Sequence, residues 1–203
     1  PMYETFLQPT DDMHNHIYLT YDNALVCYAL RALAELLNLP ELAEETERTR
    51  RAVYEHCVKE QNGRPFFAWS VDLNGHFDIY DEPPGSLQLL AELGFCEKDD
   101  PVWQNTVAMI RAPEYRYSFA GCPIAEIGCP HAPHPWLLSV ANSLLCGRGE
   151  QSLAILRASP MDNGIACESV NEDTGVCETG EAFATCAGFL SYALYCACFS
   201  QGG

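Results

Sequence analysis

The sequence predicts an all-α fold of paired antiparallel helices, a helical-hairpin toroid of which about half is present. Apolar residues recur with helical spacing in several segments of the 203-residue chain. Between the later segments lie two long loops rich in Pro, Gly and His, over residues 112–135 and 159–179. Loops of this length in a compact domain usually carry function. Functional loops gathered at one end of helical hairpins are typical of a toroid rather than a bundle.

The first predicted pair of helices covers residues 22–39 and 41–60. Helical spacing of apolar residues begins at Asp22, and Pro40 interrupts it after Leu39. The second segment carries more charge and is expected to end at the tripeptide Gln61-Asn62-Gly63. The residues of this second helix expected to face the core are Ala43, Val53 and Cys57.

A short β-hairpin is expected after the second helix. The aromatic-rich runs 66–71 and 76–80 flank the dipeptide Asn74-Gly75. Asn-Gly between two such runs favours a two-residue β-turn, because both residues adopt positive φ readily.

Helical periodicity resumes in the second half of the chain and leaves one helix without a pairing partner. That odd helix, and the small number of hairpins, indicate an incomplete toroid. The expected helices are 85–93, 101–110, 136–146, 150–157 and 180–198.

Composition predicts one domain, residues 1–203, because 48% apolar residues suffice for one substantial core. Eleven basic residues against 28 acidic ones give a net charge of −17. This charge repels phosphate backbones and anionic lipid, so nucleic-acid and membrane partners are not expected. A neutral ligand such as a sugar is compatible with it.

The eleven cysteines are interpreted as buried free thiols, because their number is odd, their spacing is irregular and no CxxC pair is present. Free thiols in this number favour a cytoplasmic location. No cofactor or metal motif is found, and no apolar stretch approaches the roughly 20 residues of a membrane span. The start, Pro1-Met2-Tyr3-Glu4, reads as a cut inside a longer chain.

Polar residues concentrate in three loops with apolar surroundings. The first is Gln8–Asp12, in which Asp11 and Asp12 either cap the following helix or act in catalysis. The second, Ile127–Trp136, holds two imidazoles between prolines beside an indole. Because these histidines lack a third metal ligand, hydrogen bonding to a polar ligand is favoured over metal binding.

The third loop, Met161–Val170, contains Glu168 between small and apolar residues, a setting that tunes a carboxylate for proton transfer. Two carboxylates that are distant in sequence and face one cavity are the usual equipment of a glycosidase. The first and third loops therefore predict an acid and base pair.

Five segments, in order, resemble glycoside hydrolase family 125, the metal-independent exo-α-1,6-mannosidases with an (α/α)6 barrel. Gln8–Asp12 resembles the family's Arg-Pro-Ser-Asp-Asp, and Asp81–Leu87 with Leu93-Gly94-Phe95 resembles Asp-Asp-Ala-Asn-Val-Pro-Ser-Leu with a following Leu-Gly-Phe. Asp100–Thr106 resembles Asp-Pro-x-Tyr-Gln-Asn-Thr. The remaining two are Ile127–Pro133, similar to Ile-Gly-Ser-Pro-His-Thr-Pro, and Gly164–Ser169, similar to Gly-Phe-Met-His-Glu-Ser.

The resemblance implies an inverting, metal-independent exo-α-mannosidase acting on mannose-containing oligosaccharides. Its general acid would be Asp11 or Asp12, which remain open alternatives, and its general base would be Glu168. The sugar subsite would be lined by Asp81, Glu82, His131 and Trp136. Since family members have a further N-terminal portion, this chain would be the C-terminal half of the barrel. The expected partner is that N-terminal half or a self-associated copy.

Departures from the family pattern leave two alternative functions open. Gln8 replaces the family's Arg, Cys167 replaces a His before the base, and two indoles of the final helix are replaced within Glu181–Ala187. The first alternative is a non-catalytic carbohydrate-binding or interaction domain derived from such an enzyme. The second is a related helical-barrel glycosidase with another sugar preference.

Overall fold

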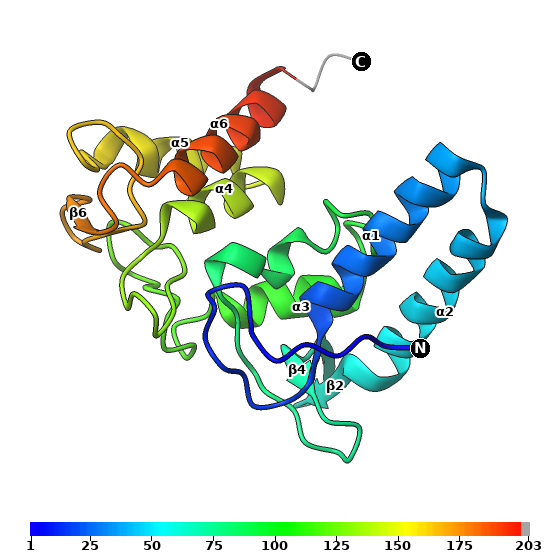
Figure 1. Cartoon of the computed structure of the whole chain (residues 1–203). Helices are drawn as coiled ribbons and strands as arrows, with labels where there is room; N and C mark the ends of the chain where they lie inside the picture. The colour runs from blue at the N-terminus through cyan, green and yellow to red at the C-terminus, as the bar shows by residue number, and fades with distance from the viewer. Residues whose placement is uncertain (200–203) are drawn as a thin grey trace. The chain divides into compact units, whose positions relative to one another are not determined.

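The computed structural model describes residues 1–199, which form six α-helices, two 3-10 turns and three two-stranded sheets (Figure 1). This confirms the predicted helical fold with a small hairpin. The chain divides into two compact units, of which unit 1 comprises residues 1–81 and 87–107 and unit 2 comprises residues 82–86 and 108 onward. The prediction of one partial barrel domain stays a prediction.

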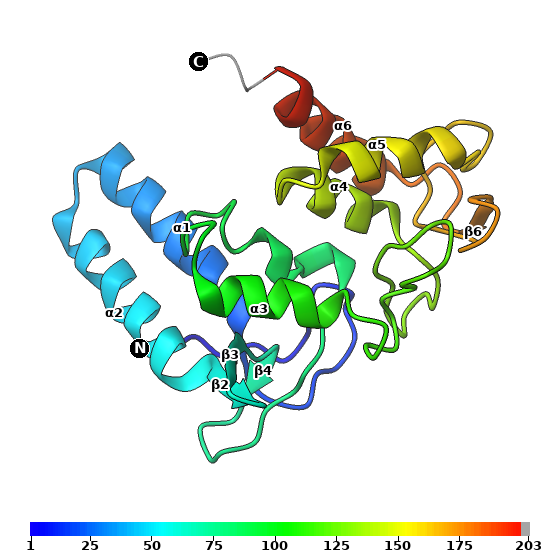
Figure 2. The same ribbon diagram turned by 180° about the vertical axis from the view of Figure 1, so that it is seen from behind.

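Unit 1 is built on a helical hairpin. Helices α1 (Thr20–Leu37) and α2 (Pro40–Cys57) lie side by side and antiparallel (Figures 1 and 2). Asn38 ends α1 in the left-handed conformation, with φ of 55°. Pro40 also starts α2, because proline is well suited to the first helical position, where no backbone N–H donor is needed.

The second helix ends earlier than predicted, at Cys57 rather than Glu60. Strands β2 (Val58–Gln61) and β3 (Arg64–Phe67) pair as a regular hairpin. Asn62 and Gly63, expected to terminate a helix, instead form its turn with φ of 54° and 74°. Of the residues of this helix that were predicted to face the core, Val53 is buried as predicted, whereas Ala43 is exposed and its prediction is wrong.

The chain reverses at Asn74-Gly75 as predicted, but its flanks form little regular sheet. The Asp72 amide donates to the His76 carbonyl at 3.3 Å, and Val71 and Phe77 form an isolated bridge. Strand β4 (Ser70–Val71) pairs with β1 (Tyr18–Leu19), a pairing that is not predictable from the sequence pattern.

The core of unit 1 is aromatic. The ring of Tyr54 on α2 contacts Phe67 of β3 at a centroid distance of 5.3 Å and Phe95 at 5.8 Å. Helix α3 (Pro101–Ile110), which matches its predicted bounds, adds Trp103 and the Thr106 hydroxyl that accepts the Phe67 amide.

The predicted helix 85–93 is wrong. Two 3-10 turns, η1 (Pro83–Gly85) and η2 (Leu87–Leu89), occupy this stretch. The carboxylate of Asp81 accepts the Leu87 amide at 2.7 Å, and this local side-chain bond competes with helical pairing.

Unit 2 is organised around helix α4 (Leu137–Leu145), all nine residues of which are buried. Helices α5 (Gly149–Ala158) and α6 (Ala184–Phe199) pack against it (Figure 1). A buried ion pair between Arg111 and Glu126, at 3.0 Å, is linked to α4 through the hydroxyls of Ser139 and Ser143.

Helix α6 begins four residues later than predicted, at Ala184. Gly180 and Ala182 have φ of 62° and 49°, which is incompatible with a right-handed helix. Strands β5 (Ser169–Val170) and β6 (Cys177–Thr179) precede it and pair antiparallel.

All eleven cysteines lie in the described part of the chain and are free thiols, and six of them are buried. In residues 1–199, no helix combines the length and apolarity needed to cross a bilayer.

Candidate active site

The acid-bearing loop lies in unit 1 and is closed on itself by backbone hydrogen bonds. The Gln8 amide donates to the Asp12 carbonyl at 3.0 Å, and the Asp11 amide donates to the Gln8 carbonyl at 2.8 Å. The indole of Trp69 donates to the side-chain oxygen of Gln8 at 3.2 Å, which ties the loop to the segment before β4. These bonds close the loop and connect it to the segment before β4.

The two predicted acids differ in environment. Asp11 is exposed and has a left-handed backbone with φ of 65°. Asp12 is half-buried, and the hydroxyl of Thr10 donates to its Oδ2 at 3.3 Å.

A third aspartate of unit 1, Asp22 in the first turn of α1, was not predicted as a site residue. Burial raises its pKa, and the charge of nearby His14 opposes this. Both ring nitrogens of His14 are buried without a hydrogen-bond partner within residues 1–199. In the sequence, Asp22 belongs to a run with helical periodicity, and this periodicity does not indicate that its carboxylate is buried.

Glu168 lies in unit 2, between the buried residues Cys167 and Ser169. The hydroxyl of Thr179 donates to its Oε2 at 2.7 Å. The Glu168 amide donates to the carbonyls of Thr179 and Gly180, at 3.2 and 3.1 Å. Glu168 is thus held by hydrogen bonds to both its backbone and its carboxylate.

Two buried thiols, those of Cys167 and Cys186, lie near this half-buried glutamate. Burial raises the pKa of the Cys167 thiol to about 12, and the neighbouring Cys177 adds to the rise. Burial also raises the pKa of Cys186 to about 12, and the negative charge of Glu168 contributes. These thiols stay protonated at neutral pH and pack as small apolar groups.

The structure brings the predicted His-Pro loop and the loop that contains Glu168 together. The Leu137 amide donates to the Glu168 carbonyl at 3.1 Å, the Val170 amide donates to the Pro135 carbonyl at 2.9 Å, and Trp136 and Ser169 form an antiparallel bridge. The residues in contact are separated by more than thirty positions, and the sequence alone did not indicate their contact.

Within the His-Pro loop, the predicted residues differ in exposure. His131 is exposed, with its ring centroid 6.2 Å from that of Trp136. Trp136 is 2% exposed, and its indole donates to the Ala132 carbonyl at 2.9 Å. His134 bonds to Glu172 at 2.9 Å and lowers the pKa of that carboxylate. Trp136 thus stabilises the loop, and its contact with a sugar stays a prediction.

Asp81 and Glu82 are both fully buried. The chain passes from unit 1 to unit 2 between them. Asp81 holds the Leu87 amide, whereas Glu82 precedes η1, whose Pro83 carbonyl accepts the side-chain amide of Asn142 at 2.9 Å. Thus Asp11, Asp12 and Asp81 belong to unit 1, and Glu82, His131, Trp136 and Glu168 belong to unit 2.

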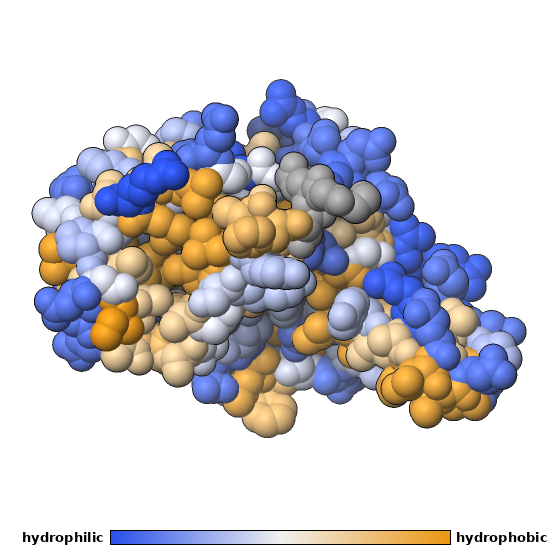
Figure 3. Space-filling view, turned by 90° about the horizontal axis from the view of Figure 1, so that it is seen from above, coloured by the Kyte–Doolittle hydropathy of each residue, from blue (hydrophilic) through white to orange (hydrophobic). Residues whose placement is uncertain are grey.

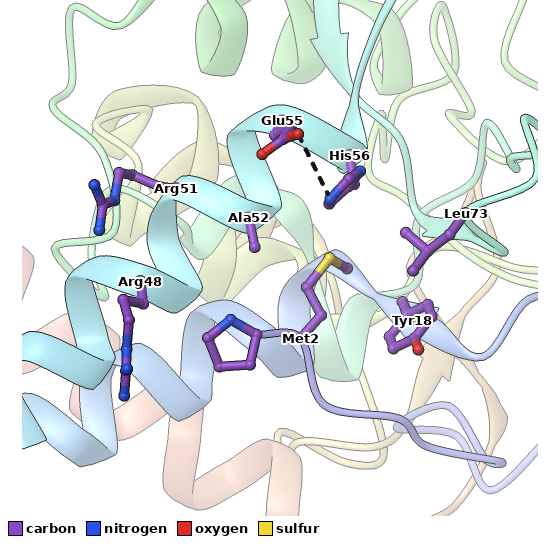
Figure 4. Close-up of a pocket in the computed structure, with 9 residues that line it drawn as sticks. Met2, Tyr18, Arg48, Arg51, Ala52, Glu55, His56 and Leu73 are labelled. Carbon is purple, nitrogen blue, oxygen red and sulfur yellow. Dashed lines mark ion pairs between the residues drawn. The ribbon is translucent and has the colours of Figure 1, made fainter.

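A separate pocket of about 550 Å³ lies in unit 1, between the start of the chain and α2 (Figure 4). Arg48, Arg51 and His56 line it, with His56 4.0 Å from Glu55. None of the predicted site residues belongs to its lining.

The helical hairpins match the fold of the helical-barrel glycosidases. Residues 1–194 match the family described as metal-independent alpha-mannosidase (GH125), and the chain belongs to that family. Among residues 1–199, no group of three or more His, Cys, Asp or Glu side chains is arranged to hold a metal ion.

Two solved structures share the fold. One is a metal-independent alpha mannosidase from Streptococcus pneumoniae, in a non-productive complex with alpha-1,6-mannobiose. It is 22% identical with a TM-score of 0.76, over 96% of this chain and 51% of that chain. The other is a bacterial glucoamylase complexed with acarbose, 15% identical with a TM-score of 0.64, over 89% of this chain and 33% of that chain.

The meiotically up-regulated gene 157 protein of Schizosaccharomyces pombe is 28% identical over 180 residues, which is 81% of this chain and 35% of the yeast protein. The chain therefore spans about half of the solved mannosidase and about a third of the yeast relative.

Proposed function

We propose that this chain is the acid- and base-bearing part of an inverting exo-α-mannosidase that acts on α-1,6-linked mannose in glycans. Family membership supports the mannosidase class. The observation that carries the proposal is the environment of Glu168. One oxygen of its carboxylate is anchored by Thr179, and the other has no hydrogen-bond partner among residues 1–199. That second oxygen is available to take a proton from water.

In the proposed reaction, an aspartic acid of the first loop gives its proton to the glycosidic oxygen. Glu168 removes a proton from a water molecule, whose oxygen attacks the anomeric carbon from the opposite face. The bond from that carbon to the glycosidic oxygen breaks, and its electron pair stays with the protonated leaving group. Inverting pairs of carboxyls stand about 6.5–9.5 Å apart to admit this water.

Of the two candidate acids, Asp12 is the better one. A general acid must be held in a fixed direction toward the oxygen that it protonates, and a hydrogen-bonded, half-buried side chain meets this requirement better than an exposed one. Asp12 is half-buried and oriented by Thr10, whereas Asp11 is exposed. Asp11 is accordingly assigned to the turn that presents Asp12.

Sugar hydroxyls are proposed to bind to Asp81, Glu82 and His131, with Trp136 supporting the His131 ring. His131 supports this assignment best, because it is exposed on a loop joined to the base loop by backbone hydrogen bonds.

The exposed apolar face of α6 is proposed to be covered by further helices of the barrel. The helix contains no charged residue over Ala184–Phe199, yet Tyr192, Tyr195 and Phe199 are 51, 62 and 74% exposed. Helices that are apolar on all sides are normally buried, and Figure 3 shows broad apolar areas on one face of the molecule. The solved relative has a further half of its length to supply such helices.

This surface is tested by gel filtration and by binding of an apolar dye to the chain alone. Dye binding that falls when Tyr195 and Phe199 are replaced by Lys is expected. A particle of 22.5 kDa that binds no dye would contradict the proposal, and a particle of twice that mass would indicate self-association instead.

The activity is tested by hydrolysis of α-1,6-mannobiose with the parent chain, Glu168→Gln and the control Asp173→Asn. Asp173 is exposed in the turn between β5 and β6, so its amide variant should keep the parent rate. Loss of turnover in Glu168→Gln alone is expected. Measurable turnover at the same rate in all three proteins would refute the assignment of the base.

A non-catalytic carbohydrate-binding domain is the second candidate, favoured by one observation. Ala182 and Thr185 stand where the family has indoles, and both are exposed. Binding of mannobiose by the parent without turnover would support this candidate, and turnover of α-glucosides in place of mannosides would indicate a related glycosidase.

A further inference from the structure

We infer that Thr179 is a positioning residue for the base Glu168, and that the Ser169 hydroxyl orients Thr179. This inference rests on the proposed function. Thr179 lies at the end of β6, directly opposite Ser169 of β5. Neither residue carried a functional prediction from the sequence.

The hydrogen bonds around Thr179 have only one consistent direction. An ionised carboxylate accepts but does not donate, so the Thr179 hydroxyl must donate to Oε2 of Glu168, at 2.7 Å. The hydroxyl oxygens of Thr179 and Ser169 are 2.6 Å apart. Because the Thr179 proton is already committed, Ser169 must be the donor in this second bond. The result is a directed chain from Ser169 through Thr179 to the carboxylate.

The backbone supports the same arrangement. The Glu168 amide donates to the Thr179 carbonyl at 3.2 Å, so Thr179 contacts both ends of the glutamate. Ser169 is fully buried, which isolates its hydroxyl from competing water. Gly180 follows with φ of 62° and lets the backbone pass close to the Glu168 side chain.

The two carboxylate oxygens of Glu168 therefore have different roles. Thr179 fixes Oε2, and the Glu168 carboxylate accepts no further hydrogen bond within residues 1–199. Rotation of the carboxylate about its last bond is thereby restricted, and Oε1 is kept in one direction for the attacking water. A charge-assisted hydrogen bond of this kind is stronger than a neutral one.

The kinetic test compares Thr179→Val, which removes the hydroxyl at constant shape, with Thr179→Ser, which keeps it. Thr174→Val, in the exposed turn between the strands, is the control. For Thr179→Val we expect kcat on α-1,6-mannobiose to fall by about 10- to 100-fold, as misplacement of a reacting group does. KM should stay within about twofold, because the substrate contacts are unchanged. Thr179→Ser should recover most of the rate.

Two outcomes separate this inference from the proposed function. Parent kcat in Thr179→Val, with Glu168→Gln inactive, overturns the positioning role and leaves the hydrolase assignment intact. Parent kcat in Glu168→Gln overturns the assignment of the base, and the positioning role falls with it.

A second measurement needs no turnover. The melting temperature is compared for Thr179→Val in the parent chain and in a Glu168→Ala background. If the hydrogen bond is present, Thr179→Val should clearly lower the melting temperature of the parent chain. It should lower that of the Glu168→Ala background little further, because the effects of substituting two interacting side chains are not additive. Equal falls in both backgrounds would overturn the contact.

Discussion

The substitution Gly180→Ala tests the geometry of the base most sharply. Gly180 has φ of 62°, and a Cβ atom added there would lie 2.6 Å from the Cβ of Glu168. Both atoms are attached directly to the backbone, so neither can rotate away. To reach an ordinary contact of 3.4 Å, Glu168 or the chain beside it must move by roughly 0.8 Å.

The expected cost has two parts. Placing an alanine in the left-handed region costs about 1–2 kcal/mol. The clash adds about 1–3 kcal/mol, as overpacking of a close-packed site does. Because ~1 kcal/mol corresponds to about 2–4 °C in a chain of this size, the clash alone should lower the melting temperature by about 2–12 °C. A displacement of nearly 1 Å at the base should lower kcat by about 100-fold.

Gly147→Ala is the matched control, since Gly147 lies outside the proposed catalytic loops, has φ of 92° and has no atom within 4 Å of an added Cβ. This control variant has the free-energy cost of an alanine in the left-handed region but not the cost of the clash. Thermal unfolding of both variants and hydrolysis of mannobiose measure the two effects. Equal melting temperatures and equal rates for the two variants would refute the close packing of Gly180 against Glu168.

Three further predictions concern the acid, the buried ion pair and pH. Asp12→Asn should lower kcat by about 10²–10⁴-fold and Asp11→Asn by much less, measured on mannobiose; the reverse order would assign the acid to Asp11. Arg111→Met leaves the buried Glu126 carboxylate without its cation and should cost about 3–5 kcal/mol in urea unfolding, whereas the double variant with Glu126→Leu should cost less. A double variant less stable than Arg111→Met would contradict this account of the ion pair. The bond from His134 lowers the pKa of Glu172, so its stabilisation is present above the ordinary carboxyl pKa and is lost as pH falls through the lowered one. The melting temperature should therefore fall on acidification below about pH 4.5, and by less in His134→Ala; an identical fall in both proteins would exclude this contribution.

The helices were predictable wherever apolar periodicity was unbroken, as in α3, α4 and α5. Errors arose where a local bond competes with the helix. Asp81 caps the Leu87 amide and leaves only 3-10 turns in the stretch predicted as 85–93. The strand pairing was also misjudged, because two Asn-Gly dipeptides lie close together and periodicity does not distinguish which forms the regular hairpin.

The predictability of the site differs between its parts. Glu168 was predicted as the base from its small and apolar neighbours and from the family resemblance, and this role stays a prediction. Thr179 and Gly180 were not, because their role depends on cross-strand contacts to residues about ten positions away. The sequence likewise could not separate Asp11 from Asp12, since the difference is a backbone torsion and the degree of burial.

The most direct test of the whole account is the configuration of the sugar first released from α-1,6-mannobiose, followed by proton NMR. If Glu168 activates water for a single displacement, β-mannose appears first in the parent protein, and Glu168→Gln releases none. First release of α-mannose, or parent-like release by Glu168→Gln, would contradict the central claim.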